Sequence, residues 1–191
     1  APMPSLTPVT VSGITGATAL AAGNFFTCAI LGDRTVRCWG SNGNGQLGAM
    51  TMTTTSRVPV TVGADLQNPR RIFAGSTFAC VESADNRLRC WGEGRSGQFG
   101  NGMLVATPTP STVTLTGPFA GTALGDDFAC TVGASGPSCW GSNGGGQRAT
   151  GVFSTATGGL PEPPNGLTGA ASFAAGYPHT GVSAGLGLLF T

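Results

Sequence analysis

The segment Cys-Trp-Gly-Ser-Asn-Gly-Asn-Gly-Gln-Leu-Gly at Cys38–Gly48 recurs twice along this chain of 191 residues. The second copy, Cys-Trp-Gly-Glu-Gly-Arg-Ser-Gly-Gln-Phe-Gly, occupies Cys90–Gly100, and the third, Cys-Trp-Gly-Ser-Asn-Gly-Gly-Gly-Gln-Arg-Ala, occupies Cys139–Ala149. Repetition at about 50 residues indicates stacked supersecondary units, none of which buries its apolar face alone. This repeat decides the fold class.

An upstream match precedes each copy and extends the pattern to a fourth unit. Ala21–Cys28 aligns with Phe73–Cys80 and Leu124–Cys130, and Ala174–Gly181 is a fourth copy in which glycine replaces the cysteine. The anchor positions 28, 80, 130 and 181 are 52, 50 and 51 residues apart. We expect a single domain over residues 1–191, with units at about 7–56, 57–106, 107–158 and 159–191.

Each unit is predicted to contain four short strands. The first is a β-branched run such as Pro8–Val11, Val58–Val62 or Ser111–Leu115, and the second ends at the glycine of the upstream match. The third carries the first cysteine and the fourth carries Cys-Trp. Short strands separated by Gly, Asn and Asp are typical of all-β architectures, and no stretch shows helical periodicity. Four-stranded units of this length predict the blades of a β-propeller.

The runs Trp39–Gly48 and Ala22–Cys28, the latter reading Ala-Gly-x-x-Phe-x-Cys, resemble the repeat of the regulator of chromosome condensation family. The resemblance covers nearly the whole chain and implies a propeller, which in this family usually closes with seven blades. Seven such units need roughly 350 residues, so this chain holds only about four. We therefore expect an open arc or partial propeller, with a closed four-bladed ring as the alternative.

All six cysteines lie inside the repeat, in pairs whose members are nine or ten residues apart. The midpoints of the pairs fall on turn residues such as Asp33 and Asp85, as expected if each pair spans a hairpin. Directly opposed residues of antiparallel strands have the Cα separation that a disulfide requires. We predict three local disulfides, namely Cys28–Cys38, Cys80–Cys90 and Cys130–Cys139.

Disulfides indicate an oxidising compartment, so we expect an extracellular or secreted protein. The chain starts at Ala1 without an initiator methionine, which fits a mature exported protein and equally an excised segment. Buried free thiols in a reducing cytosol are the open alternative. Zinc is disfavoured because zinc ligands usually lie two to four residues apart. No stretch is long and apolar enough for a transmembrane helix, so no membrane insertion is expected.

Charge is sparse and disfavours nucleic acid as a partner. Only 9% of residues are charged, the nine basic residues are all arginine, and the net charge is +1. Nucleic-acid binding depends on several basic side chains gathered on one face.

The residues offer no catalytic constellation, so we expect no enzyme activity, no cofactor and no metal. The single histidine, His179, takes the place of Phe26, Phe78 and Phe128 in the repeat and is predicted to be structural. A single histidine supplies neither a catalytic triad with a second base nor a His-based metal site. The adjacent pair Asp126-Asp127 is interpreted as a solvated turn.

Two sets of residues are interpreted structurally and one as a contact surface. The tryptophans are predicted to pack between blades, and the glutamines to satisfy backbone groups of the loops. An apolar residue recurs thirteen positions after each tryptophan, and it forms either a contact patch or a loop anchor against the adjacent blade. A charge-free edge strand near the chain end favours association. The sets are Trp39, Trp91 and Trp140; Gln46, Gln98 and Gln147; and Met52, Leu104, Phe153, Leu188, Leu189 and Phe190.

The combined interpretation is an exported, non-enzymatic repeat protein that acts through protein–protein contacts. Its partner is another protein or further copies of itself, and a self-assembling extracellular subunit is the form favoured by the apolar edge strand. The alternative is a monomeric secreted binding module, such as an enzyme inhibitor or a lectin-like ligand binder.

Overall fold

The computed structural model describes residues 6–51, 53–63, 66–151, 154–167, 169–176, 180–184 and 187–190. Strands are the regular elements of these residues, which include no helix and hence none able to cross a membrane. The strands are β1 (Ala17–Ala22), β2 (Phe26–Leu31), β3 (Val36–Ser41), β4 (Thr55–Thr61), β5 (Pro69–Ala74), β6 (Phe78–Ser83), β7 (Arg87–Gly92), β8 (Thr107–Thr116), β9 (Gly121–Leu124), β10 (Phe128–Gly133), β11 (Gly136–Asn143), β12 (Ser154–Glu162), β13 (Ala170–Ala175), β14 (Thr180–Ala184) and β15 (Gly187–Phe190).

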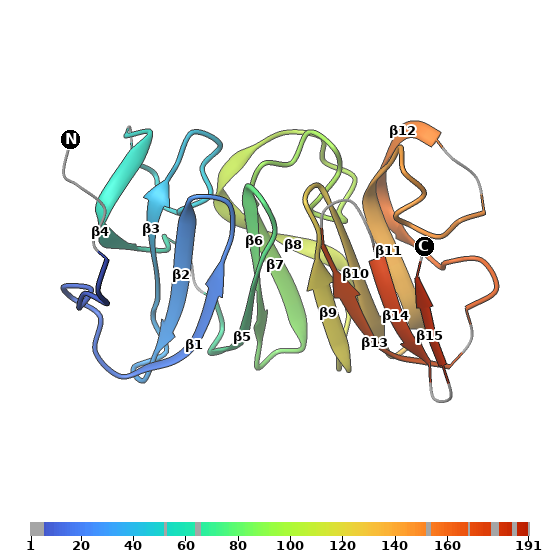
Figure 1. The fold of residues 1–191 in the computed structure, drawn as a ribbon, viewed down its shortest axis with the longest axis horizontal. Helices are drawn as coiled ribbons and strands as arrows, with labels where there is room; N and C mark the ends of the chain where they lie inside the picture. The colour runs from blue at the N-terminus through green and yellow to red at the C-terminus, as the bar shows by residue number, and fades with distance from the viewer. Residues whose placement is uncertain are drawn as a thin grey trace.

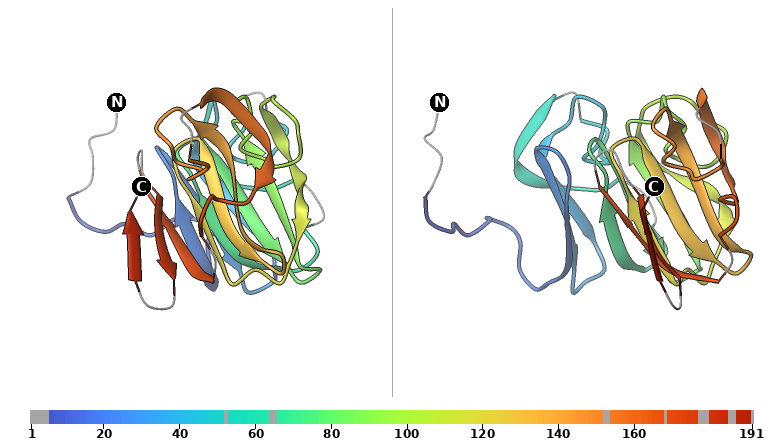
Figure 2. Two further views of the ribbon diagram at one scale, coloured as in Figure 1. Left: turned by 90° about the vertical axis from the view of Figure 1, so that its right-hand side faces the viewer. Right: turned by 45° about the vertical axis from the view of Figure 1, so that its right-hand side comes forward.

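These strands form four antiparallel sheets, each made of consecutive strands. Three sheets have four strands, β1 to β4, β5 to β8 and β9 to β12, and the fourth contains the three described strands β13 to β15. The first three sheets stand side by side, with the first sheet at one end (Figure 1), and the fourth sheet packs against the third without extending the row (Figure 2). The predicted all-β, propeller-like array is confirmed, in its open form.

The β-branched runs expected to begin each unit instead complete the preceding sheet. Strand β4 pairs with β3 through Val60 and Cys38, and β8 pairs with β7 through Ser111 and Cys90. After the Gly-Gln loop, the chain returns along the edge of the strand that it has just left, as short antiparallel connections do. The sheets are therefore offset by one strand from the expected units, and Pro8–Val11 forms no strand.

The apolar cores lie between consecutive sheets. One core joins Ile30 of the first sheet to Ile72 and Trp91 of the second sheet. The next core joins Phe99, in the loop after β7, to Trp140 of the third sheet, and a smaller core connects the third and fourth sheets. Each sheet therefore completes the core of its neighbour, which explains why the units occur as an array.

Three disulfides cross the β2–β3, β6–β7 and β10–β11 hairpins. The bonded cysteines are directly opposed in the strand register and fully buried, as the spacing predicted. No free cysteine remains. The confirmed pairs are Cys28–Cys38, Cys80–Cys90 and Cys130–Cys139, each with Cα atoms 4.1 Å apart.

The glycine of the upstream motif marks the closest approach between neighbouring sheets. A Cβ atom on Gly23 would lie 2.0 Å from the ring of Phe26 and 2.3 Å from the carbonyl oxygen of Gly75. A Cβ atom on Gly75 would meet the Phe78 ring and the Gly125 carbonyl oxygen at 2.2 and 2.5 Å. The Gly-x-x-Phe spacing therefore lets each inner strand pack against its own phenylalanine and against the next sheet.

Candidate functional site

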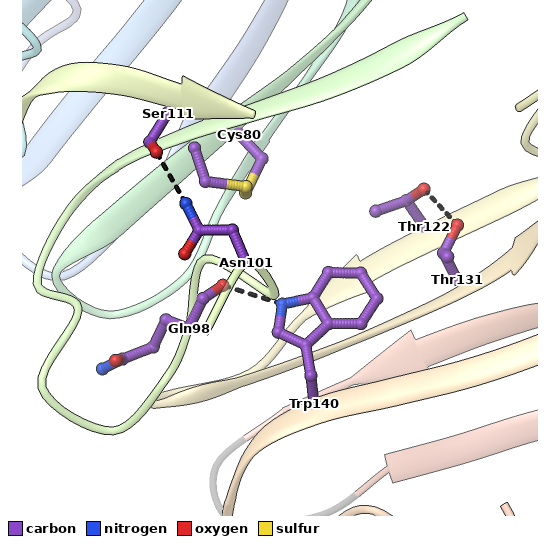
Figure 3. Close-up of a disulfide and its surroundings, with 8 residues drawn as sticks. Cys80, Gln98, Asn101, Ser111, Thr122, Thr131 and Trp140 are labelled. Carbon is purple, nitrogen blue, oxygen red and sulfur yellow. Dashed lines mark hydrogen bonds between the residues drawn. A yellow bond between two sulfur atoms is a disulfide. The ribbon is translucent and has the colours of Figure 1, made fainter. Parts of the chain in front are cut away.

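A tryptophan packs in each contact between neighbouring sheets among the first three, and we call such a sheet-to-sheet contact a joint. The indole N–H of Trp91 donates a hydrogen bond to the main-chain oxygen of Gln46 at 3.0 Å. The indole N–H of Trp140 donates to the main-chain oxygen of Gln98 at 2.8 Å (Figure 3). Both indoles are fully buried. A large apolar ring with a single donor therefore fills the joint and leaves no unsatisfied group on the indole.

The glutamine that accepts from the tryptophan also closes its own loop. The Oε1 atom of Gln46 accepts from the backbone N–H of Asn44 at 2.9 Å, and Gln98 and Gln147 do the same for the residue two positions earlier, at 2.9 and 2.8 Å. All three glutamines are buried. The side chain thus fixes the loop, which in the first two units holds the main-chain oxygen toward the next sheet.

A glycine ends each of the first two loops and makes room for the indole. Gly48 has a φ of +66°, and a Cβ atom there would lie 2.8 Å from Nε1 of Trp91. A Cβ atom on Gly100 would lie 3.0 Å from the Trp140 ring. The third loop ends instead in Ala149, which has a similar φ of +51°. The third loop therefore carries a methyl group at the position where the first two loops have none.

Trp39 differs from the other two tryptophans because no sheet precedes it in the structure. It is partly exposed, and none of the described residues accepts a hydrogen bond from its indole. Leu20 on β1 is 64% exposed, whereas its counterpart Ile72 is buried. Arg57 on β4 is also exposed. We call the surface formed by Leu20, Trp39 and Arg57 the open face.

The third loop carries a buried arginine that sequence reasoning passed over. Arg148 occupies the place of the buried Leu47 and Phe99, and its guanidinium forms an ion pair with Glu162 at 3.1 Å. Its Nε atom is buried without a hydrogen-bond partner among the described residues. The only sequence signal was a charge in an otherwise apolar column of the repeat.

The inner corners of the sheets surround a shallow hollow of about 480 Å³. Three equivalent turns each contribute one polar residue, Asn24, Ser76 or Asp126, and glycines, alanines and Leu124 line the remainder. The backbone N–H of Asn24 donates to the main-chain oxygen of Ser76 at 2.8 Å, which joins the first two corners. This hollow marks the axis around which the sheets are arranged.

The acidic pair at the third corner has no acid–base partner in the described part of the chain. Burial raises the pKa of Asp127 above its ordinary value, with a further rise from Asp126 and an opposing hydrogen bond from Ser142. The sequence predicts a solvated turn here, and Asp127 is instead partly buried. His179 lies outside the described residues. No group of three or more His, Cys, Asp and Glu residues suitable for a metal ion occurs among those described.

The predicted contact residues are only partly placed. Leu104 is 47% exposed, beside the exposed Met103 and Val105. Met52 and Phe153 lie outside the described residues. Leu188, Leu189 and Phe190 fall on β15, which pairs with β14. More of the exposed large apolar side chains lie in the first sheet, its loops or the segment before it, and these are Leu6, Val9, Leu20, Phe25, Met50 and Val58.

Two segments of the chain, residues 17–46 and 70–98, match the family model described as the regulator of chromosome condensation (RCC1) repeat. These segments include the tryptophan of the first unit, that of the second, and the glutamines that follow them. No curated protein matches the chain.

Several solved structures share the fold. The chain is similar to a crystal structure of Kap60 bound to yeast RCC1 (Prp20), with a TM-score of 0.80, 20% identity, and coverage of 93% of this chain and 44% of that one. It is also similar to the crystal structure of Prp20p from Saccharomyces cerevisiae, reported with its binding to Gsp1p and histones. The TM-score is 0.74 at 21% identity, and the match covers 96% of this chain and 47% of that one. The ectodomain of the Physcomitrella patens receptor kinase CR4 matches with a TM-score of 0.61 at 21% identity, over 96% of this chain and 42% of that one. This chain therefore spans less than half the length of each.

Proposed function

Because this chain carries repeats of the regulator of chromosome condensation type, we propose that it is an exported, non-enzymatic repeat protein that acts through protein–protein contacts. The single observation that carries the proposal is the open face. The counterparts of Leu20 and Trp39 in the second unit are buried in a joint, yet here both are accessible. A surface with the composition of a joint that none of the described residues covers is suited to binding another protein.

Proteins with this fold supply precedents for such a role. Yeast Prp20 was crystallised with Kap60, and its binding to Gsp1p and histones has been studied. Those partners belong to a protein more than twice as long as this chain, so the partner proposed here is defined only as a protein.

Export is supported by the three disulfides, which indicate an oxidising compartment. The CR4 structure offers a precedent, since it is the ectodomain of a receptor kinase. The absence of an enzymatic role is supported by the repeat fold and by the purely structural contacts of the polar groups at the joints.

Two forms of this function make different predictions about mass. A self-assembling subunit gives species larger than the 18.9 kDa chain, whereas a binding module is monomeric until its partner is added. Light scattering after size-exclusion chromatography separates the two forms. Intact mass after alkylation without reductant tests export, because an exported chain has no alkylated thiol. Six alkylated thiols in protein isolated from its native source would contradict the proposal.

A further inference from the structure

Arginines gather at the end of the first two sheets that lies opposite the Gly-Gln loops. The β2–β3 and β6–β7 turns and the start of β5 lie at this end (Figure 1). Six of the nine arginines of the chain occur here against three described acids, and Asp65 lies outside the described residues. The arginines are Arg34, Arg37, Arg70, Arg71, Arg87 and Arg89, and the acids are Asp33, Glu82 and Asp85.

Three of these arginines already have partners within the chain. Arg71 forms an ion pair with Glu82, and Arg89 forms one with Asp85. The guanidinium of Arg37 donates to the main-chain oxygen of Gly13 at 3.4 Å. The charges of these groups are therefore largely committed to the fold.

The other three, Arg34, Arg70 and Arg87, are exposed and form no ion pair or hydrogen bond with any described residue. The one acid near Arg87 is Asp85, which is bonded to Arg89. A guanidinium is a planar fork of donors that matches a carboxylate. This end of the molecule therefore presents unpaired groups suited to carboxylates.

A pocket of about 190 Å³ opens beside these arginines, between the first two sheets. Its apolar lining is formed by Val36, Val62 and Leu66, which are all buried in the core of the joint. Sites for small molecules usually measure about 300–1,000 Å³, so this pocket suits a single side chain. The remaining lining residues are Arg34, Thr35, Thr61, Gln67, Asn68 and Pro69.

The second joint shows what kind of side chain fits at this end. Pro69 and Phe119 hold the same position in the repeat, four residues before the strand residue that pairs with the first cysteine of a disulfide. Phe119 is buried and packs in the core of the second joint. Pro69 has no such ring, and it lines the pocket. A large apolar side chain is therefore the group that the first joint lacks here.

We propose that this pocket, which we call the arginine pocket, binds an acidic segment of a partner protein that carries one large apolar side chain between carboxylates. The apolar side chain enters the pocket, and the carboxylates pair with Arg34 on its lining and with Arg70, which directly follows Pro69. This inference rests on the proposed function for the class of partner. It adds a surface that is separate from the open face.

The two parts of the site have different roles. Exposed ion pairs each contribute little to affinity, so the apolar side chain supplies most of the binding. The arginines select an acidic segment and orient it, and they make association dependent on salt. Three unpaired arginines are few for nucleic acid, whose binding needs many neutralised phosphates.

The test uses the full ¹⁵N-labelled chain and a capped synthetic peptide, Glu-Asp-Phe-Asp-Glu. We expect saturable shifts of the backbone N–H signals of Thr35, Gln67 and Asn68, which line the pocket. A peptide with glycine in place of phenylalanine should bind at least about tenfold more weakly. A peptide with amides in place of the carboxylates should also bind more weakly, and its binding should not depend on salt.

Variants of the chain locate the site. The double substitution Arg34→Glu and Arg70→Glu should weaken peptide binding at least about tenfold. Arg57→Glu is the matched control, because Arg57 is also exposed and unpaired among the described residues but does not line the pocket. Urea midpoints verify that both variants are folded. Absence of shifts at millimolar peptide, or equal weakening by both variants, overturns the inference.

A sulfated polysaccharide is the other source of anionic groups, and heparin is the probe for it. Heparin has no apolar side chain, so it should bind the chain more weakly than the peptide does. Tighter binding of heparin at the same three signals would identify a glycan as the occupant and overturn the proposed partner. If the peptide fails to bind while the chain forms complexes of defined mass with a protein, the proposed function stands and the arginine pocket falls.

Discussion

The indole nitrogen of Trp91 lies 3.0 Å from the main-chain oxygen of Gln46, across the joint between the first and second sheets. Both residues are buried, so neither group reaches water if the bond is lost. The core around the indole is apolar, and this hydrogen bond helps to fix how one sheet packs on the next. Trp39 has the same sequence context but no such partner among the described residues.

Replacing the buried tryptophan should therefore cost more than replacing the open one. Trp91→Phe removes the donor and leaves the Gln46 oxygen buried and unpaired, so the free energy of unfolding should fall by about 1–3 kcal/mol. Trp39→Phe should change it by less than about 0.5 kcal/mol. Urea denaturation of the two variants measures the difference, and equal losses would show that Trp39 is also seated in a joint.

The loop glycines provide a second comparison. Gly48→Ala should destabilise the chain by about 1–3 kcal/mol, because the new Cβ atom meets the Trp91 indole and the backbone keeps a positive φ. Gly43→Ala is the matched control, since a Cβ atom there has nothing within 4 Å and φ is not positive. Denaturation midpoints compare the two, and equal midpoints would argue against close seating of the indole.

The central disulfide should contribute measurably to stability. Replacing both Cys80 and Cys90 with alanine opens a closed loop of ten residues of sequence separation, which should cost about 2–3 kcal/mol. The double variant avoids leaving a free thiol in the core. A midpoint in urea that is unchanged from that of the native chain would contradict a stabilising role.

Two carboxylates should give opposite dependences of stability on pH. Burial raises the pKa of Asp127, so its charged form is disfavoured in the folded chain and stability falls as pH rises from 3.8 through the folded value. The hydrogen bond from Arg89 lowers the pKa of Asp85, so its contribution is present above 3.8 and is lost as pH falls through the folded value.

At neutral pH, Asp127→Asn should consequently raise the free energy of unfolding and Asp85→Asn should lower it. The difference for Asp127→Asn should vanish below pH 3.8, and that for Asp85→Asn should vanish only below the lowered folded pKa of Asp85. Urea midpoints between pH 2.5 and 7 measure both variants against the native chain. Differences of the same sign would show that one of the two environments is misassigned.

The repeat was sufficient to predict the fold class and the disulfide pairs, because both depend on local spacing. Opposed cysteines in a short hairpin need no knowledge of neighbouring sheets. The assignment of the β-branched strand to the following sheet was wrong. Periodicity fixes the length of a unit but not the position at which one sheet ends and the next begins. The pairing of Val60 with Cys38 decides that point, and only the structure supplies it.

The open face was not predictable from the local sequence. Trp39 and Trp91 occur in the same Cys-Trp-Gly context, and they differ only in whether a sheet precedes them in space. Likewise, the replacement of the loop glycine by Ala149 becomes informative only once it is known how close a Cβ atom on Gly48 would lie to the Trp91 indole. Substitutions in a repeat become informative once the contacts of the unsubstituted copies are measured.

Hydroxyl-radical footprinting of the three tryptophans in the free chain tests the open face most directly. Mass spectrometry of the peptides gives a separate modification rate for each indole. The structure predicts that Trp39 is modified much faster than Trp91 and Trp140, which are fully buried. A rate for Trp39 as low as theirs would mean that this face is already covered, and would contradict its assignment as the binding surface.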